Sequence, residues 1–392
     1  MKLETIEIQN FKVYQDVKLE NIGSMGVFLG ENGSGKTTFF DVFGFMKACL
    51  TENVRSALQS RGGYNEIHSR DAVGDIKLIF KYRVLPSNPL CTYEIHIGVD
   101  RKKNPVINRE RLSYRRGSGG KPWNFIDFSM GKGVAITNEG ALKEKIEDAE
   151  REEFDLAAPD ILAIKSLGQM QKFGAAVEFR KFLEDWFVSD FQIDKMRSMQ
   201  DISYNESLNR RGDNIANVAQ YLHDQHPDRF KRILNKIQER IPGMSKVEAK
   251  TTEEGGILLR FQDGRFKDPF ASKYVSDGTI KMFAYLVMLA DPNPHKLLCI
   301  EEPENQLYPR LLEILAEEFR EYAAQDGQVF ISTHSPDLVN ALEPHELFFI
   351  KKQDNGYSEI KAVAENEQIV SIYNEGDKLG YLWKEGLLED LL

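Results

Sequence analysis

The stretch Met25-Gly-Val-Phe-Leu-Gly-Glu-Asn-Gly-Ser-Gly-Lys-Thr-Thr38 decides the fold. It opens with the apolar run Met25 to Leu29, which is typical of a buried strand. Residues Gly30 to Thr37 then fit the pattern G-x-x-x-x-G-K-[ST] without a mismatch. A helical pattern follows, to about Cys49. Because the loop stands between a strand and a helix, a chance glycine-rich turn is disfavoured, and the stretch predicts a phosphate-binding loop.

This loop predicts a site for ATP with Mg²⁺. Its glycines let the backbone curl so that N–H groups point at phosphate oxygens, and the following helix adds the positive end of its dipole. We expect Lys36 to reach the β- and γ-phosphates and the Thr37 hydroxyl to ligate Mg²⁺. The predicted nucleotide-binding residues of the loop are Gly30, Glu31, Asn32, Gly33, Ser34, Gly35, Lys36, Thr37 and Thr38.

A second apolar strand, predicted over Lys296 to Ile300, ends in Glu301 and Glu302. Side chains at the carboxyl ends of strands gather at the ligand-binding edge of an open α/β sheet. We therefore expect Glu301 to hold Mg²⁺, directly or through water. Glu302 is expected to orient or deprotonate the attacking water, a role typically worth ~10²–10⁴-fold in rate. The alternative is a surface acidic pair that caps the next helix, and the phosphate-binding loop in the same chain argues against it.

A third apolar strand, predicted over Gln328 to Ser332, leads into a polar cluster that contains His334. A lone histidine is usually structural. Here it follows a buried strand, where active-site residues of open α/β sheets gather. We expect it to act in hydrolysis by hydrogen-bonding the γ-phosphate or the attacking water.

Together these motifs resemble the ABC-type ATPase heads of the RecF/SMC group, in the branch of stand-alone AAA-like ATPases related to the overcoming-lysogenization-defect proteins. Ile8-Gln-Asn-Phe-Lys-Val-Tyr14 is similar to the first strand of that family, Glu301-Glu-Pro-Glu-Asn-Gln-Leu-Tyr-Pro309 to its Walker B and D-loop, and Ser332-Thr-His-Ser-Pro336 to its switch-histidine motif. The resemblance is strong over Leu3 to Leu50 and Ser272 to Lys352, and weak between them. It implies an α/β P-loop NTPase fold with a mixed sheet, a β-rich lobe and a helical insertion.

The family also has a signature motif that contacts ATP bound to the opposite subunit. Tyr274-Val-Ser-Asp-Gly-Thr-Ile-Lys281 resembles it, with Ser276 and Gly278 at matching positions, while Asp277 and Thr279 depart from the usual residues. The resemblance implies that each P-loop faces the signature of a second subunit, and hence a homodimer that closes on ATP. The alternative is a plain helix N-cap, which is compatible with a signature.

Two further positions follow from the resemblance. Lys12 is expected to contact the nucleotide, and Gln59 to be the glutamine that senses Mg²⁺. Both residues fit equally well as surface polar side chains.

Relatives of this kind are commonly encoded beside a nuclease-like partner in anti-phage defence. The resemblance thus implies a sensor or regulator subunit of a DNA-directed process. Two alternatives stay open: an ATPase subunit of a membrane transporter, and a nucleotide-gated scaffold that touches no DNA. The long insertion and the non-standard signature argue against the transporter.

The pattern along the chain predicts four segments. Residues 1–133 form the N-terminal part of the ATPase lobe, 134–245 a mainly helical insertion, 246–365 the C-terminal part of the lobe and 366–392 a tail. Strands from both ends of the chain are expected to share one sheet. Within the middle, helices are predicted over Lys143 to Asp155, Val177 to Val188 and Ile215 to Arg240, and a hairpin over Lys246 to Phe270.

A basic stretch, Arg101 to Lys121, is predicted to be an exposed hairpin and loop. It holds eight Lys or Arg and one acidic residue, with Tyr114 inside it and Trp123 just after it. Such a stretch could track the phosphate backbone of DNA or RNA. The alternative is a solvated hairpin whose charges balance an acidic chain. The basic residues are Arg101, Lys102, Lys103, Arg109, Arg111, Arg115, Arg116 and Lys121.

Composition limits the remaining functions. The formal net charge of −10 argues against indiscriminate coating of nucleic acid. The three cysteines are far apart and form no CxxC pair, which predicts a reducing compartment and no zinc site. No apolar run approaches the length that spans a bilayer, and residues 1–10 carry no signal-peptide pattern. We therefore expect a cytoplasmic location without membrane contact.

Overall fold

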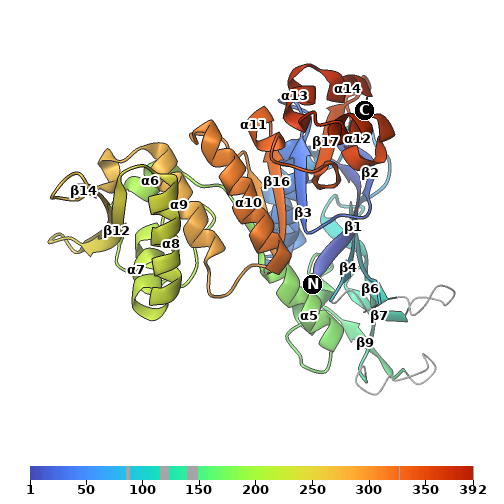
Figure 1. The fold of residues 1–392 in the computed structure, drawn as a ribbon. Coiled ribbons are helices and arrows are strands. Elements are labelled where there is room, and N and C mark those ends of the chain that lie inside the picture. Colours follow the sequence, from blue (N-terminus) through green and yellow to red (C-terminus); the bar gives the residue numbers. More distant parts are fainter. Residues whose placement is uncertain (85–88, 115–122, 139–148, 326, 392) are drawn as a thin grey trace. The chain divides into compact units, whose positions relative to one another are not determined.

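The computed structural model describes residues 1–84, 89–114, 123–138, 149–325 and 327–391, and the chain divides into two compact units (Figure 1). The first unit comprises Met1–Trp186, Pro344–Glu375 and Leu388–Leu392. The second comprises Phe187–Glu343 and Gly376–Leu387. Each has a core of its own, with Phe43 fully buried in the first and Phe283 in the second.

An antiparallel sheet of eight strands forms much of the first unit, in the order β2-β1-β4-β5-β6-β7-β8-β9. In β4, buried and half-buried residues alternate, and Ile76, Leu78 and Phe80 are fully buried, as the two-residue period of a strand requires. The eight strands are β1 (Lys2–Phe11), β2 (Tyr14–Leu19), β4 (Ile76–Arg83), β5 (Cys91–Val99), β6 (Pro105–Tyr114), β7 (Trp123–Ser129), β8 (Lys132–Ile136) and β9 (Arg151–Asp155).

The strand that precedes the phosphate-binding loop is β3 (Met25–Leu29), and all of its residues are buried. It pairs in parallel with β17 (Leu347–Lys352), which pairs antiparallel with β18 (Ser358–Ala362). Strands from both ends of the chain thus share one sheet, as predicted.

Helix α1 (Lys36–Thr51) begins within the loop. Its aromatic side chains pack on the strand, with the rings of Phe28 and Phe39 centred 4.2 Å apart. Each fully buried phenylalanine stabilises such a core by about 1.5–3 kcal/mol relative to an exposed one. The other helices of the first unit are α2 (Val54–Gln59), α3 (Tyr64–Ile67), α4 (Ala163–Leu167), α5 (Gly174–Glu184) and α12 (Glu367–Asn374), and most of α14 (Leu387–Leu391) also belongs to it.

In the second unit, helices α7 (Ile215–Gln225) and α8 (Pro227–Arg240) pack beside the predicted hairpin, which is β12 (Met244–Thr251) and β13 (Gly256–Asp263) (Figure 1). The acidic strand, β15 (Leu297–Glu301), pairs in parallel with β16 (Gln328–Thr333). The remaining elements include β10 (Trp186–Ser189), α6 (Ile193–Arg197), β11 (Gln200–Asp201), β14 (Phe270–Ala271), α9 (Asp277–Leu289), α10 (Pro309–Gln325), α11 (Pro336–Val339) and α13 (Leu379–Lys384).

Three predicted helices were wrong in part. Arg151–Asp155, the described end of a predicted helix, is the strand β9, which pairs with β8. The helix predicted to reach Val188 ends at Glu184, and the Trp-Phe-Val run that follows forms β10. The long helix from Ile215 divides at Pro227, because proline has no N–H to donate and disfavours a helical residue before it. Pairing with a neighbouring strand overrode local helix propensity in the first two cases.

The prediction of an exposed hairpin over Arg101 to Lys121 was also wrong in part. Residues Pro105–Tyr114 form β6, an interior strand between β5 and β7, and its Val106, Ile107 and Leu112 are buried. Residues 115–121 lie outside the described residues. The four-segment division of the chain stays a prediction.

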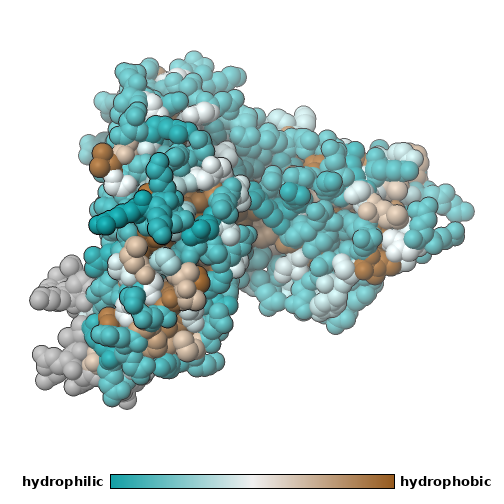
Figure 2. Space-filling model, turned by 180° about the vertical axis from the view of Figure 1, so that it is seen from behind, coloured by the Kyte–Doolittle hydropathy of each residue, from teal (hydrophilic) through white to brown (hydrophobic). Residues whose placement is uncertain are grey.

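The face seen in Figure 2 is mainly hydrophilic, with hydrophobic residues in small patches. Within the described ranges, no helix is both long enough and apolar enough to cross a bilayer.

Candidate active site

The phosphate-binding loop has a tight and well-supported backbone. Gly35 adopts φ of 115°, a conformation that residues with a side chain rarely reach. Gly30 packs against β17 so closely that an added Cβ would lie 2.5 Å from the carbonyl oxygen of Ile350. The glycines are therefore required by the path of the chain at these two positions.

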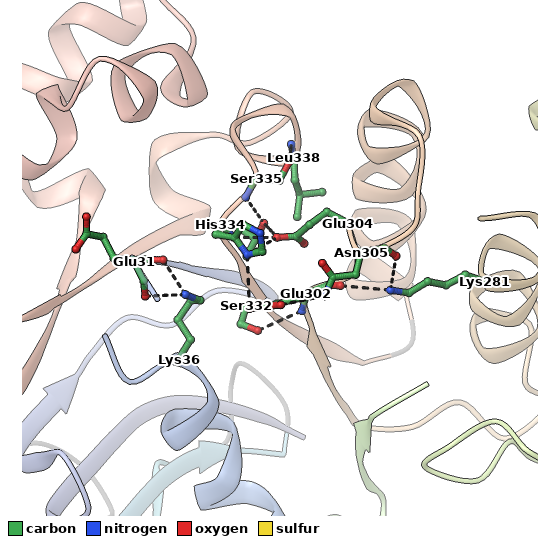
Figure 3. A network of polar contacts seen from close by, with 12 residues as sticks. Glu31, Lys36, Lys281, Glu302, Glu304, Asn305, Ser332, His334, Ser335 and Leu338 are labelled. Carbon is green, nitrogen blue, oxygen red and sulfur yellow. Dashed lines mark hydrogen bonds and ion pairs between the residues drawn. The ribbon is translucent and has the colours of Figure 1, made fainter. Parts of the chain in front are cut away.

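Lys36 lies folded into the loop, only 5% exposed (Figure 3). Its Nζ donates hydrogen bonds to the carbonyl oxygens of Gly30 at 2.7 Å and Glu31 at 2.9 Å. The ammonium is thus surrounded by oxygen acceptors of its own loop. Thr37 and Thr38 stand in the first turn of α1, the former exposed and the latter half-buried.

Two residues that were not predicted as site residues form hydrogen bonds to carbonyl oxygens of the loop. The Tyr14 hydroxyl donates to the carbonyl of Gly35 at 2.9 Å, and the Ser358 hydroxyl donates to that of Ser34 at 2.5 Å. Burial raises the pKa of Tyr14, so the hydroxyl keeps its proton and its role as a donor. Tyr14 could have been suspected from its place in the first-strand motif, whereas nothing in the sequence pattern marks Ser358.

Lys12 and Gln59 are also in the first unit. The Lys12 ammonium pairs with Asp41 at 2.7 Å, and Arg61 pairs with the other oxygen of that carboxylate at 2.8 Å. Gln59 is exposed at the last residue of α2. The nucleotide contact of Lys12 and the Mg²⁺-sensing role of Gln59 stay predictions.

The second unit holds the predicted acidic residues and the predicted histidine. Glu301 is half-buried at the end of β15, opposite Ser332 of β16 in the strand register. Glu302 leaves the strand with φ of 43°, in the left-handed region, where a residue with a side chain is strained by about 1–3 kcal/mol. Its N–H donates to the carbonyl of Ser332 at 2.9 Å, and its Oε2 accepts from the Asn305 amide at 3.0 Å.

The structure brings His334 next to this acid (Figure 3). Its Nδ1 lies 3.5 Å from Oε1 of Glu302 and 3.4 Å from Oε1 of Glu304. The imidazole is 44% exposed, so it can reach a ligand as well. Its position beside two carboxylates leaves the imidazole able to form hydrogen bonds both to these acids and to a ligand.

Glu304 was not predicted as a functional residue, yet it organises the histidine loop. It is buried, and its Oε1 accepts from the Thr333 hydroxyl and from the His334 backbone N–H, both at 2.8 Å. Its position two residues after Glu302, inside the quoted Walker B and D-loop motif, was the available signal.

The predicted signature residues begin α9. The Ser276 hydroxyl accepts from the N–H of Thr279 at 3.3 Å, so the plain N-cap role is present. Asp277, which departs from the usual signature, pairs with the guanidinium of Arg197. A cavity of about 890 Å³ adjoins this helix start, lined by Ser276 and Gly278 among other residues of the second unit.

The basic stretch is not a continuous row of solvated charges. Arg109 pairs with Asp127 at 3.5 Å, and Arg111 pairs with Glu94. The pKa of Glu94 is lowered to about 2 by its hydrogen bond with His96 and by Arg111. Trp123 is only 7% exposed and therefore cannot offer its face to a base. Of the predicted residues within the described part, Arg101, Lys102 and Lys103 remain exposed.

The arrangement of strands and helices defines the class of the protein. The structure is similar over 92% of this chain to an SMC head bound to the C-terminal winged-helix domain of ScpA, covering 97% of that chain, with a TM-score of 0.53 and 14% identity. An SMC head derived from Pyrococcus furiosus, bound to the C-terminal domain of ScpA, is similar over 95% of this chain and 99% of its own, with a TM-score of 0.53 and 11% identity. The fold is that of an ABC-type, RecF/SMC-like ATPase head, an α/β P-loop fold, as predicted.

The sequence places the chain in a family. The AAA domain family described as "putative AbiEii toxin, Type IV TA system" matches residues 145–340, which is 196 of the 392 residues, and the chain belongs to it. The DNA replication and repair proteins RecF of Lactococcus lactis subsp. cremoris (strain MG1363) and subsp. lactis (strain IL1403) are 26% and 25% identical to it over 148 residues. These matches cover 35% of this chain and 40% of each relative, so the chain spans about two fifths of the curated relatives it matches.

Proposed function

We propose that this chain binds ATP with Mg²⁺ and hydrolyses it to ADP and phosphate. The observation that carries the proposal is the placement of His334 beside Glu302, at 3.5 Å, at the end of the acidic strand of a chain that also carries a P-loop. A base or water-positioning residue is one of the recurring parts of phosphoryl-transfer sites, and a neighbouring histidine can add a hydrogen bond to the water or the phosphate.

Each group of site residues has a proposed role in binding or hydrolysis of ATP. The Gly30–Thr38 loop binds the phosphates, and phosphate oxygens replace the carbonyl oxygens that now accept from Lys36. Glu302 orients or deprotonates the water, and His334 hydrogen-bonds the water or the γ-phosphate. The Thr37 hydroxyl and the Glu301 carboxylate are oxygen donors of the kind that Mg²⁺ prefers, and would hold it. When bound, Mg²⁺ neutralises charge on the phosphates.

We further infer that two copies of the chain close on ATP, with Ser276 and Gly278 of one facing the nucleotide of the other. The cavity of about 890 Å³ at the start of α9 supports this inference, because it is in the size range of small-molecule sites and adjoins a helix N-terminus, which favours anions.

The wider role proposed is regulation of a DNA-directed process in the cytoplasm, as the ATPase or sensor subunit beside a nuclease-like partner in anti-phage defence or DNA repair. The names of the relatives, DNA replication and repair proteins, support a DNA role, and the family description names a putative toxin of a type IV TA system. The SMC heads of similar fold are described as bound to another protein.

Phosphate release from the purified full chain with Mg²⁺ and ATP tests the enzymatic core of the proposal. We expect turnover by the wild type and none by Lys36→Ala, with nucleotide binding also abolished in the variant. A wild-type chain that releases no more phosphate than Lys36→Ala, alone or with DNA, would refute it. Affinity purification from the native host with ATP and Mg²⁺ tests the partner, and recovery of no nuclease-like protein would count against that part.

A further inference from the structure

The helix that begins at the signature residues lies directly against the turn that carries Glu302. A side chain at position 278 would place its Cβ 2.8 Å from the carbonyl oxygen of Gln306, so this glycine allows the start of α9 to pack on the turn. One helical turn further along, Lys281 contacts the same turn (Figure 3). Gly278 and Lys281 are three residues apart and therefore share one face of the helix.

Lys281 is an unusual residue for this position, because it is only 5% exposed. Lysine is rarely buried unless its charge is compensated. Its Nζ donates to the carbonyl oxygen of Asn305 at 2.8 Å and to that of Glu302 at 3.4 Å. Burial lowers the pKa of the ammonium to about 8, and the carboxylates of Glu304 and Glu302 act in the opposite direction.

The turn that Lys281 holds is strained at both ends. Glu302 has φ of 43° and Gln306 has φ of 67°, both in the left-handed region. Such residues persist only where surrounding contacts impose them. The contacts of α9 meet this requirement, since Lys281 bonds the carbonyl of Glu302 and Gly278 abuts the carbonyl of Gln306.

Lys281 also affects the buried carboxylate of Glu304. This carboxylate is buried, and its Oε2 has no hydrogen-bond partner among the residues that the structure describes. A buried charge without a counter-charge is costly. The Lys281 ammonium has a favourable electrostatic interaction with this carboxylate.

We propose that Lys281 is a positioning residue: it holds Glu302 in the conformation from which its carboxylate meets His334, and thereby connects the signature end of α9 to the hydrolytic base. Ser276 and Gly278 are at the start of α9, and Lys281 is one turn further along the same helix. Because the helix is rigid, a displacement of its start moves Lys281 as well. The contact of a second subunit's nucleotide with the signature would then set the alignment of Glu302. This inference rests on the proposed function and adds a means by which closure of the dimer controls hydrolysis.

Replacement of Lys281 by methionine tests the proposal, since methionine keeps most of the length of the side chain and removes the ammonium. With the full chain, we expect kcat to fall by about 10-fold or more, a modest part of what a correctly placed general base contributes. We expect the Kd for a fluorescent ATP analogue to stay within about 3-fold of wild type, since the carbonyls that Lys281 bonds belong to the turn of the candidate base and not to the phosphate-binding loop. Lys281→Arg, which keeps a charged donor, should restore part of the lost kcat.

Lys236→Met is the matched control. Lys236 belongs to the same unit and pairs with Glu318 and Glu321, neither of which is part of the turn, so its loss should lower stability and leave kcat unchanged. Equal kcat in Lys281→Met and wild type would overturn the proposal. An equal fall in kcat in Lys281→Met and Lys236→Met, at equal loss of stability, would also overturn it, because the fall would then be a general effect of lower stability. If Lys281→Met does not fold, Lys281→Gln takes its place with the same expected outcomes. Lack of turnover in the wild type would instead overturn the proposed function itself.

Discussion

Oε1 of Glu304 accepts a hydrogen bond from the backbone N–H of His334 at 2.8 Å and thereby ties the histidine loop to the turn that carries Glu302. The same oxygen accepts from the Thr333 hydroxyl at 2.8 Å, so one buried carboxylate fixes two consecutive residues. The relative positions of the candidate base and the candidate histidine thus depend on a residue that need not touch ATP.

Glu304→Ala should therefore impair hydrolysis more than nucleotide binding. Removal of the acceptor leaves the buried Thr333 hydroxyl and the part-buried His334 N–H without it, at a cost of about 1–3 kcal/mol for the buried donor, and frees the His334 loop. We expect kcat to fall by about 10-fold or more, as for other losses of alignment in a general-base site. Glu304→Gln keeps one oxygen acceptor and serves as the control, with a smaller loss. Steady-state kinetics and ATP-analogue binding measure the two effects, and full activity of Glu304→Ala would contradict the prediction.

Glu302→Gln should bind ATP and hydrolyse it slowly, because the amide cannot take a proton from water. We expect a fall in rate of about 10²–10⁴-fold. The trapped ATP-bound state should be a dimer, which size-exclusion chromatography with light scattering can detect with Mg²⁺ and ATP. Lys36→Ala is the control that should remain monomeric under the same conditions. Wild-type turnover by Glu302→Gln would show that another group is the base.

Glu110 should make the stability of the first unit depend on pH. Burial in β6 raises the pKa of its carboxyl from 4.5 to about 7, against the opposing effect of hydrogen bonds from Ile164 N–H, Ala163 N–H and the Tyr93 hydroxyl. Between these two values the folded chain retains a proton that the unfolded chain has lost. The free energy of unfolding should therefore be highest below pH 4.5 as far as this group is concerned, and should fall as the pH rises to about 7.

Denaturant unfolding between pH 5 and pH 8 can measure this contribution, whose slope cannot exceed about 1.4 kcal/mol per pH unit. Glu110→Gln removes the titration and should flatten the profile by the same amount. At pH 5 it should also lower stability by about 1–3 kcal/mol, because whichever way the amide turns, its NH₂ faces a backbone N–H. This difference should shrink as the pH rises to about 7, because the wild type loses stability over that range and the variant does not. A profile for Glu110→Gln that parallels the wild type would show that other groups cause the pH dependence.

The exposed turn beside β6 should carry whatever phosphate-backbone interactions the basic stretch makes. Arg101→Glu with Lys102→Glu should weaken binding to DNA and reduce the dependence of log K on log salt by about 2, near 0.9 for each phosphate that is no longer neutralised. Lys231→Glu with Lys246→Glu, also exposed, gives the same change in net charge in the second unit and should leave the salt dependence unchanged. Fluorescence anisotropy across a salt series provides the measurement, and equal effects of the two pairs would indicate a general charge effect only.

Local pattern was sufficient for the elements that carry the predicted residues. The strand before the phosphate-binding loop is a buried apolar run followed by a glycine, the acidic strand and the strand before His334 are buried apolar runs that end in polar residues, and the structure has all three. Such runs can be recognised because burial of consecutive apolar residues and a change of polarity at the strand end are properties of adjacent positions.

Charge in the sequence was a poorer guide than apolar pattern. The basic stretch looked like a solvated hairpin, but Arg109 and Arg111 lie on an interior strand and pair with acids that are distant in the sequence. A count of charges shows how many there are, and it does not show which of them are neutralised by partners.

The sequence by itself determined the phosphate-binding loop, the order of its strand and helix, and the acids and histidine that complete the predicted set, because each is written in a short run of neighbouring residues. Only the tertiary structure decided that Glu304 holds the His334 backbone, that Lys281 holds the turn of Glu302, and that Glu302 adopts a left-handed conformation. These features arise from contacts between residues about 20 to 30 positions apart on separate elements, where the energy of a buried charge or a strained residue is set by what packs against it.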